Sequence, residues 1–518
     1  MKAIIIGSGI AGLTAGAALA KDGVDVTVFE QHHRPGGVTA TIEKDGYQWD
    51  LGQLMLEGFG KDEPIGQILV ELGIYDQVSS KIDQRGYVFP DYEIRPPDTY
   101  GGPQWRMELL KEQFPEDAEG LDRYWKDYLR FTKLMTFGRK AEKASGLAKI
   151  LLMARLYWTL LPLLPKAKWS ADQLMSHYFR SEKLKMVFTS ILADFYTPPS
   201  DFLGLGIFAL NSEVSFDKRI PKSLGANTDQ LYLYSMPGGI KKLTQPMIGL
   251  IESKGGEIAV ESLVGKIVVE NNKAIGVQVG GEFHPADVVL ASGDAEQVFF
   301  KLIGKENMTE EYAQLVENQT LMDSIFMVHL GIDMDPSPYV HGPVTYYYDT
   351  YDLERAIKDA QSGDYHEGRD GFVVHVPTMH SPEMAPEGRH ALTVYTICPG
   401  TLNEGTWDER REELADRLVT YTEKYIPGLS EKTLTRVIIT PADFRELTHA
   451  KHHAFGGLAP VMNRPNIKHQ TPIEGLWFIG QQSESGGGVF NVLPSSYKVA
   501  RRIIEEGGKK QKGNLMQD

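Results

Sequence analysis

The glycine pattern that follows the first six residues constrains the fold more than any other feature of the chain. Residues 3–6 are apolar and rich in β-branched side chains, as in a central parallel strand buried on both faces. Gly7, Gly9 and Gly12 follow at the spacing of a dinucleotide-binding turn. The first glycine permits the tight turn, the second lets the backbone approach a pyrophosphate, and the third lets the helix pack on the strand.

The residues after this turn complete a strand, helix, strand unit. Residues 13–20 are alanine-rich and predict a helix, and residues 24–29 predict the second strand. Ile10 and Ala11 stand at the turn, where we expect them to line the nucleotide site. Glu30 ends the second strand, where a carboxylate can accept hydrogen bonds from a ribose 2′-hydroxyl and repel a 2′-phosphate. Because all these parts are in register, we expect an adenine dinucleotide here rather than a bare glycine turn.

A second glycine-rich turn lies almost at the other end of the chain. Residues 476–479 predict an apolar strand, and a helix is predicted from about residue 494 to residue 506. Backbone N–H groups at a glycine-rich helix entrance can face the oxygens of a cofactor and stabilise negative charge on it. Gly480, Gln481, Gly488 and Val489 stand at this turn, where we expect them to contact a cofactor.

Several motifs between these two ends carry a family resemblance. A glycine pair follows Glu30, a hairpin is predicted around Asp45-Gly46, and Asp50-Leu51-Gly52 follows it. "YSMPGG" at residues 234–239 and "TPIEGLWFIG" at residues 471–480 complete the set. With these motifs the chain resembles the phytoene desaturase, carotenoid isomerase and retinol saturase group of flavoproteins. The resemblance implies FAD as the cofactor, contacted also by Gly36, Gly37 and the backbone of Val264 near the adenine.

The resemblance also implies the fold class and the domain organisation. We expect an α/β protein in which a glutathione-reductase-like, Rossmann-type FAD-binding domain carries an inserted α+β substrate domain. The FAD-binding domain is discontinuous and is assigned residues 1–100, 236–300 and 441–518. The substrate domain is assigned residues 101–235 and 301–440.

Composition excludes some classes of partner. The formal net charge of −15 argues against nucleic acid, because phosphate contacts require clustered positive charge. The single cysteine, Cys398, cannot form an intramolecular disulfide, which fits a reducing compartment. Residues 1–7 run directly into the glycine turn and lack the features of a signal peptide, so we expect a cytoplasmic protein. The sequence carries no signal for an oligomeric state.

One apolar segment, residues 147–164, suggests contact with a membrane. Its only charges are Lys149 and Arg155, and Pro162 and Pro165 make it unsuitable for a clean transmembrane span. Basic residues frame it, so a helix lying in the membrane interface is one interpretation, with the protein peripheral on the inner face of a membrane. The alternative is a buried core helix of the substrate domain.

Catalytic side chains are harder to assign than cofactor contacts. The family resemblance places the loop of His453 just before the flavin-facing strand, and Glu484 follows that strand, so we take these two as candidate catalytic residues. Glu57 could face the substrate tunnel, although we favour a surface carboxylate as the account of it. The histidines of residues 449–453 lack a carboxylate-rich ligand set at zinc spacing, so we predict no metal site.

These features together predict an FAD-dependent oxidoreductase. The resemblance implies an apolar substrate, a long isoprenoid or polyene lipid, whose C–C or C=C bonds exchange hydride with the flavin. Desaturation, saturation and cis-trans isomerisation through a reduced flavin all use this apparatus, and the sequence does not choose among them. Three alternatives stay open: a soluble flavin amine oxidase, a nicotinamide dehydrogenase, and an FAD-binding membrane-associated protein without turnover.

Overall fold

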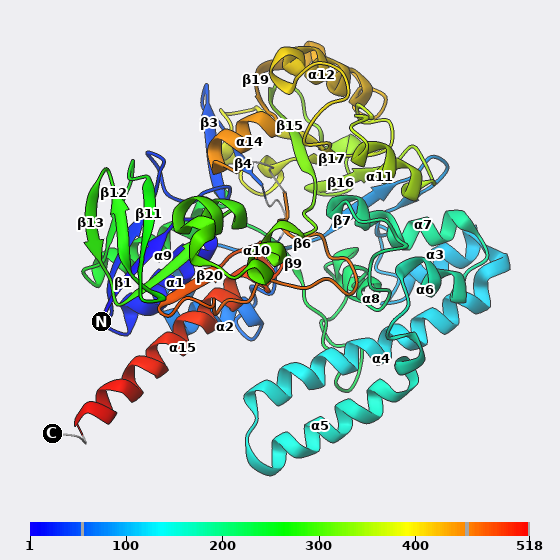
Figure 1. Ribbon diagram of the computed structural model, residues 1–518. Helices are drawn as coiled ribbons and strands as arrows, with labels where there is room; N and C mark the ends of the chain where they lie inside the picture. Colours follow the sequence, from blue (N-terminus) through cyan, green and yellow to red (C-terminus); the bar gives the residue numbers. More distant parts are fainter. Residues whose placement is uncertain (53–55, 451–454, 516–518) are drawn as a thin grey trace.

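A parallel sheet of five short apolar strands organises one lobe of the molecule. Our computed structural model describes residues 1–52, 56–450 and 455–515. The strand order is β10-β2-β1-β14-β20, with β1 Lys2–Ile6, β2 Asp25–Phe29, β10 Glu257–Ala259, β14 Val288–Ser292 and β20 Leu476–Ile479. Central Ile5 is in register with Val28 on one side and with Leu290 on the other. The sheet therefore joins both ends of the chain to its middle (Figure 1).

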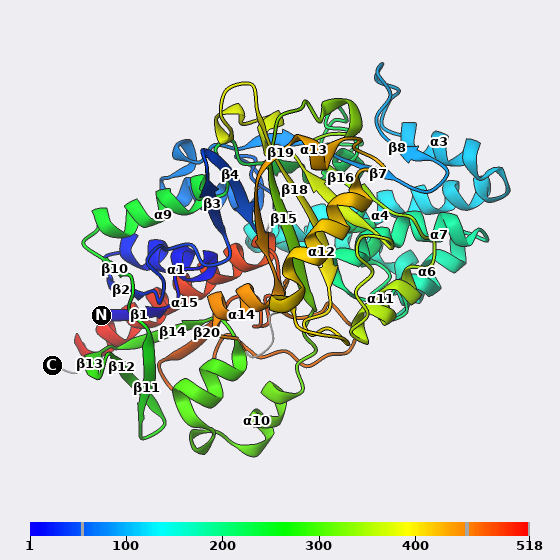
Figure 2. The same cartoon turned by 90° about the horizontal axis from the view of Figure 1, so that it is seen from above.

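Both faces of this sheet are covered, which explains why its strands are apolar throughout. One face packs on helices α1 Ile10–Lys21, α2 Pro64–Leu72, α9 Lys241–Ser253 and α15 Val489–Leu515. The other face carries an antiparallel sheet, a π-helix and a short helix: β11 Val264–Glu270, β12 Lys273–Val279, β13 Glu282–Pro285, η6 Gln297–Gly304 and α10 Glu310–Glu317. Figure 2 shows α1 and α9 on one side of the strands and β11 to β13 on the other.

Small antiparallel elements link this lobe to the rest of the chain. Strands β3 Ala40–Lys44 and β4 Tyr47–Leu51 form the predicted hairpin, and both turn residues have positive φ, 52° at Asp45 and 81° at Gly46. This is the conformation that favours Asp-Gly in a two-residue turn. A three-stranded sheet of order β5-β9-β6 follows, made of β5 Leu56–Glu57, β9 Leu233–Ser235 and β6 Lys81–Asp83.

A seven-stranded sheet organises the second lobe. Its order is β19-β15-β18-β17-β16-β7-β8, with β7 Arg85–Val88, β8 Glu93–Ile94, β15 Ser324–Ile332, β16 Val344–Tyr347, β17 Phe372–His375, β18 His390–Cys398 and β19 Thr433–Ile439. One face packs on helix α12, and the other face packs on the helical part of this lobe. The later helices of the lobe are α11 Leu353–Gln361, α12 Trp407–Thr422, α13 Leu429–Lys432 and α14 Pro441–Thr448.

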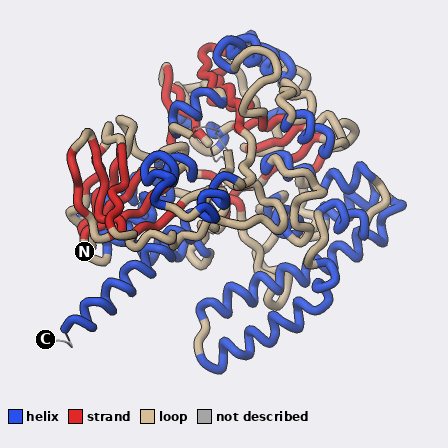
Figure 3. The backbone as a smooth tube through the Cα atoms, viewed as in Figure 1, coloured by secondary structure: helices blue, strands red, loops and turns tan. Residues whose placement is uncertain are grey.

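The helical part of the second lobe lies at the lower right of Figure 3, where only helices and loops are seen. It comprises α3 Trp105–Gln113, α4 Ala118–Lys143, α5 Gly146–Leu160, α6 Ala171–Tyr178, α7 Glu182–Thr189 and α8 Gly206–Leu210, with the 3-10 turns η3 Leu161–Lys166 and η4 Ser190–Phe195. Other 3-10 turns are η1 Tyr75–Gln77, η2 Pro115–Asp117, η5 Glu213–Ser215, η7 Lys305–Asn307, η8 Ser337–Tyr339, η9 Pro377–Met379 and η10 Pro382–Met384.

Helices α4 and α5 form a hairpin that projects from the second lobe (Figure 1). No residue of α5 is buried, and Leu147 and Trp158 are 71% and 70% exposed. The buried core helix considered for this segment is therefore wrong. Within the described residues, the stretch Gly146–Lys166 is the one helical segment long and apolar enough to cross a membrane. Only 6% of its most apolar 18 residues are buried.

The predicted fold class is confirmed, and the differences lie at element boundaries. The last helix begins at Val489 rather than near residue 494, because Pro494 is accommodated within it. β13 pairs with β12 in the antiparallel sheet, but the next strand does not. Instead β14 leaves that sheet and joins β1 and β20 in the parallel one.

Candidate cofactor and active site

A cavity of about 490 Å³ runs along the carboxyl ends of the parallel strands. Open parallel sheets bind ligands at this edge, and the volume is in the usual range of cofactor sites, roughly 300–1,000 Å³. Its lining comes from the beginning, the middle and the end of the chain. Of the predicted cofactor contacts it includes Gly7, Gly9, Ile10, Ala11, Glu30, Gly37, Val264, Gly480, Gln481, Gly488 and Val489.

The three glycines of the first turn occupy three different environments. Gly7 has a φ of 90°, as a tight turn requires, and a Cβ placed there would come within 2.7 Å of Ser292 Oγ. A Cβ on Gly9 would meet no atom within 4 Å, so this position opens into the cavity. A Cβ on Gly12 would lie 2.0 Å from the Gly7 carbonyl oxygen, so Gly12 serves helix packing and stays outside the lining.

Glu30 is fixed at one end of the cavity by backbone and hydroxyl donors. Its Oε2 accepts a hydrogen bond from the Ser8 backbone N–H at 2.9 Å and another from the Ser8 hydroxyl. Its Oε1 accepts from the His32 backbone N–H at 2.9 Å. Each carboxylate oxygen can accept about two hydrogen bonds, so Oε1, which accepts one, can still receive a ribose hydroxyl. The carboxylate is therefore oriented before any ligand binds.

The glycine pair after Glu30 supports the first turn, and Gly37 also lines the cavity. The Gly36 backbone N–H donates to Ser8 Oγ at 3.1 Å, and Gly36 is not part of the lining. A Cβ on Gly37, which has a φ of 58°, would lie 3.2 Å from the Cα of Gly9. The two glycine segments are thus in direct contact, and any larger residue at Gly37 would displace the turn.

The C-terminal glycine segment brings the beginning of α15 to the cavity. Gly480 and Gly488 have φ values of 98° and 83°, and a Cβ on Gly488 would meet no atom within 4 Å. Val489 is the first residue of α15, so the N-terminus of this helix lies at the cavity. The unpaired N–H groups of a helix N-terminus favour negative charge there.

Some residues of the site were not predicted from the sequence. Ser8, at a variable position of the glycine turn, links Glu30 to the backbone of Gly36. Asp294, just after β14, lines the cavity and accepts from Gln482 Nε2 at 3.2 Å, and Gln482 in turn accepts from the backbone N–H of Ala295. The sequence offered one signal for Asp294: it stands just after an apolar strand, and the carboxyl ends of the parallel strands all lie at the cavity.

The catalytic candidates differ in where they lie. His453 lies outside the described residues. Glu484 is not part of the cavity lining: it pairs with Lys468 Nζ at 2.8 Å and accepts from the His469 backbone N–H at 3.0 Å. Both of its carboxylate oxygens thus accept from residues outside the cavity lining. Asp50 accepts from Thr41 Oγ1 and from the Ile240 backbone N–H, so it holds the start of α9.

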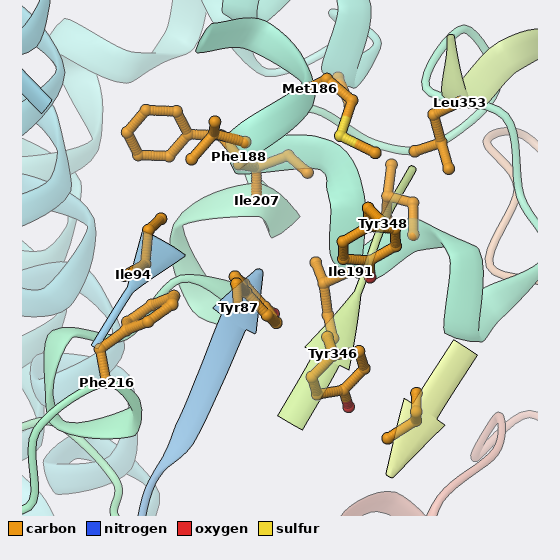
Figure 4. Close-up of a cluster of buried hydrophobic side chains, with 14 of the residues drawn as sticks. Tyr87, Ile94, Met186, Phe188, Ile191, Ile207, Phe216, Tyr346, Tyr348 and Leu353 are labelled. Atoms are coloured by element: carbon orange, nitrogen blue, oxygen red, sulfur yellow. The ribbon is translucent and has the colours of Figure 1, made fainter. Parts of the chain in front are cut away.

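Glu57 is half-buried rather than fully exposed, and it lies near the buried Arg85 on the substrate side. Burial raises the pKa of Glu57 to about 7, and the nearby Arg85 guanidinium opposes this effect. Burial raises the pKa of Asp194 to about 6, opposed by a hydrogen bond from Tyr346 and again by Arg85. Arg85 lies over the rings of Tyr87 and Phe216, and Asp194 accepts from Tyr346, which are side chains of an aromatic cluster drawn in Figure 4.

The residues of the cavity fit FAD. The N-terminal segment supplies Glu30 for a ribose and glycine backbone for a pyrophosphate, and the C-terminal segment supplies a helix N-terminus for the flavin carbonyls. A nicotinamide dehydrogenase would need only the N-terminal segment, so it would not account for the C-terminal segment at the same cavity. Fold and site together define the class of dinucleotide-binding flavoproteins that hold one extended cofactor between two distant parts of the chain.

Comparison with known proteins identifies the family. Residues 10–504 match the family described as flavin containing amine oxidoreductase, so the chain belongs to that family and is an FAD-dependent oxidoreductase. It is 23% identical over 528 residues to a lycopene-forming phytoene desaturase from Pseudescherichia vulneris, covering 98% of this chain and 99% of that one. It is 23% identical to prolycopene isomerase 2 of an Oncidium hybrid cultivar, over 99% of this chain and 85% of that one. The predicted resemblance and the predicted cofactor are confirmed.

Solved structures with the same fold include several flavin enzymes. An oxidoreductase from Methanosarcina mazei has a TM-score of 0.61 at 18% identity, covering 97% of this chain and 100% of the other. A putrescine oxidase triple mutant has a TM-score of 0.62 at 16% identity, covering 98% of this chain and 99% of the other. At these identities the likeness concerns the fold alone.

Proposed function

We propose that this protein transfers hydride between FAD and the C–C or C=C bonds of a long apolar isoprenoid or polyene. The observation that carries the proposal is the nearly end-to-end similarity to a phytoene desaturase and a prolycopene isomerase. The similarity spans the substrate lobe as well as the cofactor lobe. The two relatives carry out different reactions on polyenes, so desaturation and isomerisation both remain within the proposal.

Bound FAD would supply the hydride chemistry itself. The chain's own residues then have three tasks. Glu30 and the glycine turns orient the cofactor, and the N-terminus of α15 favours negative charge at the flavin end. The aromatic and aliphatic residues between the seven-stranded sheet and the helices exclude water from the substrate side.

The experiment compares two substrate classes under anaerobic conditions. The FAD-loaded enzyme is mixed with a polyene that carries saturated C–C bonds, and in parallel with an aliphatic diamine, while the flavin absorbance is recorded. We expect the polyene to reduce the flavin, or to isomerise when the flavin has been reduced beforehand, and the diamine to have no effect. Reduction by the diamine alone would favour an amine oxidase.

We also propose that the α4–α5 hairpin places the protein on a membrane surface, where such substrates dissolve. The exposed large apolar side chains of residues 146–166 are Leu147, Ile150, Leu151, Met153, Tyr157, Trp158 and Leu164. Lys149 and Arg155 are exposed on the same helix. Aromatic and aliphatic side chains beside basic ones are typical of helices that lie in the interface of an anionic membrane.

A further inference from the structure

The last turn of helix α14 forms one wall of the cofactor cavity. Leu447 and Thr448 of this turn line the cavity, as do the buried Phe444 one turn earlier and the exposed His449 directly after the helix. The helix belongs to the second lobe, because it follows β19 and packs against β15, β19 and α12. A cavity built on the parallel sheet of one lobe therefore has a wall that comes from the other lobe.

The beginning of α14 is held firmly within its own lobe. The Thr440 hydroxyl accepts a hydrogen bond from the Asp443 backbone N–H at 3.3 Å, and the Asp443 carboxylate pairs with Arg411 of α12 at 2.7 Å. The Arg445 guanidinium donates to the Gly400 carbonyl oxygen, also at 2.7 Å. Hydrogen bonds that involve a charged group are roughly twice as strong as those between neutral groups. The start of the helix is thus a fixed part of the second lobe.

The carboxyl end of α14 is held by side chains of the cofactor lobe. Gln31 Nε2 donates a hydrogen bond to the Leu447 carbonyl oxygen at 2.8 Å. His32 Nε2 lies 2.6 Å from the same oxygen, and because a carbonyl oxygen can only accept, the ring is the donor. A third donor, Gln297 Nε2 at the start of η6, bonds to the His449 carbonyl oxygen. We call these three bonds the α14 latch.

The α14 latch lies where the cavity meets the solvent. All three donors line the cavity, and two of them directly follow Glu30, the residue that suits a ribose. Lys301, one turn after Gln297 in η6, also lines the cavity and is exposed. Leu263 lines it as well and is 54% exposed. The cavity is therefore open beside the latch, at its adenosine end.

The bonds of the α14 latch are weaker than those that hold the beginning of the helix. Each joins a partly exposed side-chain donor to a backbone carbonyl, and none of the three is an ion pair. Such bonds exchange readily with water, so their net contribution is modest. The last carbonyls of a helix have no partner within the helix, and helix ends open at low cost. The end of α14 can therefore detach from the cofactor lobe while its beginning stays in place.

From this arrangement we propose that the carboxyl end of α14 is a gate through which FAD enters and leaves the cavity, and that the α14 latch keeps the gate closed. Release of the three bonds frees the wall formed by Leu447 and Thr448 and widens the opening at the adenosine end. Because α14 belongs to the second lobe, closing the gate also ties the two lobes together around the cofactor. The inference concerns cofactor exchange and does not depend on the nature of the substrate.

The test measures FAD exchange in the full-length holoenzyme. Protein loaded with FAD is mixed with an excess of isotopically labelled FAD, and native mass spectrometry follows the replacement, which gives the release rate. Equilibrium titration gives the Kd, and the release rate divided by the Kd gives the entry rate. Gln31→Met combined with Gln297→Met removes two latch donors and keeps the length of both side chains. We expect release to become roughly tenfold faster, the effect of two hydrogen bonds, and entry to become faster as well.

Two further variants complete the test. Gln319→Met is the matched control, because Gln319 Nε2 also donates to a carbonyl oxygen near a helix end, that of Leu315 in α10 at 2.6 Å, and to that of Pro465 at 3.2 Å, but lies outside the cavity lining. Its exchange rates should equal those of the wild type. Gln297→Met alone should accelerate both rates to a smaller extent, which keeps the test decisive if the double variant does not fold.

Two results would overturn the gate. If release becomes faster and entry does not, the glutamines only contact the bound cofactor. If neither rate changes, FAD enters by another route. Both results leave the proposed function untouched, since that is decided by the reaction of the flavin with polyenes rather than by the rate of cofactor exchange.

Discussion

At the scale of single residues, the first glycine turn separates folding from cofactor binding. Gly12→Ala places a Cβ 2.0 Å from the Gly7 carbonyl oxygen, and Gly9→Ala places one in open space within the cavity. We expect Gly12→Ala to lose at least about 2 kcal/mol of stability through overpacking. Gly9→Ala should melt like the wild-type apoprotein but retain little FAD. Thermal melts and FAD content distinguish the two, and equal losses of stability would contradict this account.

Glu30 offers a second residue-scale prediction. Glu30→Ala removes a charged acceptor, and a hydrogen bond to a charged group contributes roughly 1.5–3 kcal/mol. We therefore expect FAD affinity to fall about 10- to 100-fold, measured by equilibrium titration of the apoprotein. Glu257→Ala is the control, because Glu257 is exposed on the neighbouring strand β10 and lies outside the cavity lining. If Glu30→Ala binds FAD as tightly as the wild type, Glu30 does not contact the ribose.

The raised pKa of Glu57 predicts a particular pH dependence of stability. Its pKa is about 7 in the folded protein against an ordinary value of 4.5, so between these values the folded state binds the extra proton. Stability must then decrease as pH rises from about 4.5 to 7 and change no further above 7 as far as this group is concerned. The contribution is on the order of 3 kcal/mol at most.

Glu57→Gln isolates that contribution. Glutamine stays neutral, so the difference in melting temperature between the variant and the wild type should increase from pH 4.5 to pH 7 in favour of the variant. Above pH 7 the difference should stay constant. A difference that does not vary with pH would mean that Glu57 is solvated rather than enclosed.

Part of the residue-scale site was predictable and part was not. Gly7, Gly9 and Glu30 belong to a contiguous pattern with known geometry, so their positions at the cavity follow from spacing alone. Glu57, Arg85 and Asp194 are separated by up to 137 residues, and only tertiary packing brings both carboxylates near Arg85. Their shared environment has no local signature in the chain.

At the scale of elements, α5 carries the most direct prediction. Leu147→Glu combined with Trp158→Glu replaces two strongly exposed apolar side chains with charges. Binding to vesicles of anionic phospholipid should fall at least about tenfold, because the apolar contact with the interface is lost. The melting temperature should not change. Leu434→Glu on β19, where Leu434 is 56% exposed, is the matched control and should bind vesicles like the wild type.

Two results would contradict the interfacial account of α5. One is full vesicle binding by the double variant, which would place the membrane contact elsewhere or nowhere. The other is a large drop in its melting temperature, which would mean that these side chains are buried in solution, for instance against a second copy of the chain.

The elements also show which features sequence patterns can predict and which they cannot. The parallel strands were predictable because runs of apolar residues between glycine turns are typical of sheets covered on both faces. The position of α5 was not, since an apolar helical segment has the same pattern whether it faces a core or a membrane. Its exposure depends on what α4 leaves uncovered, which is a property of tertiary structure.

At the scale of the whole molecule, one lobe forms the cofactor cavity and the other encloses an apolar region. The parallel sheet joins both chain ends into one cofactor cavity, and the seven-stranded sheet with its helices encloses an apolar region beside it (Figure 1). Cofactor binding and substrate binding therefore depend on each other, because the segments of the substrate lobe lie in the sequence between strands of the cofactor lobe. The domain boundaries inferred from the sequence remain a prediction that limited proteolysis can examine.

The central claim is that the two glycine turns hold opposite halves of one FAD molecule, and its most direct test is the cofactor content of the purified protein. We expect a yellow protein with a flavin absorption spectrum that releases one FAD per chain on denaturation. Gly488→Val, which alters the C-terminal turn alone, should also lose most of this FAD. A protein that copurifies with a nicotinamide dinucleotide, or that keeps its FAD in Gly488→Val, would contradict the account.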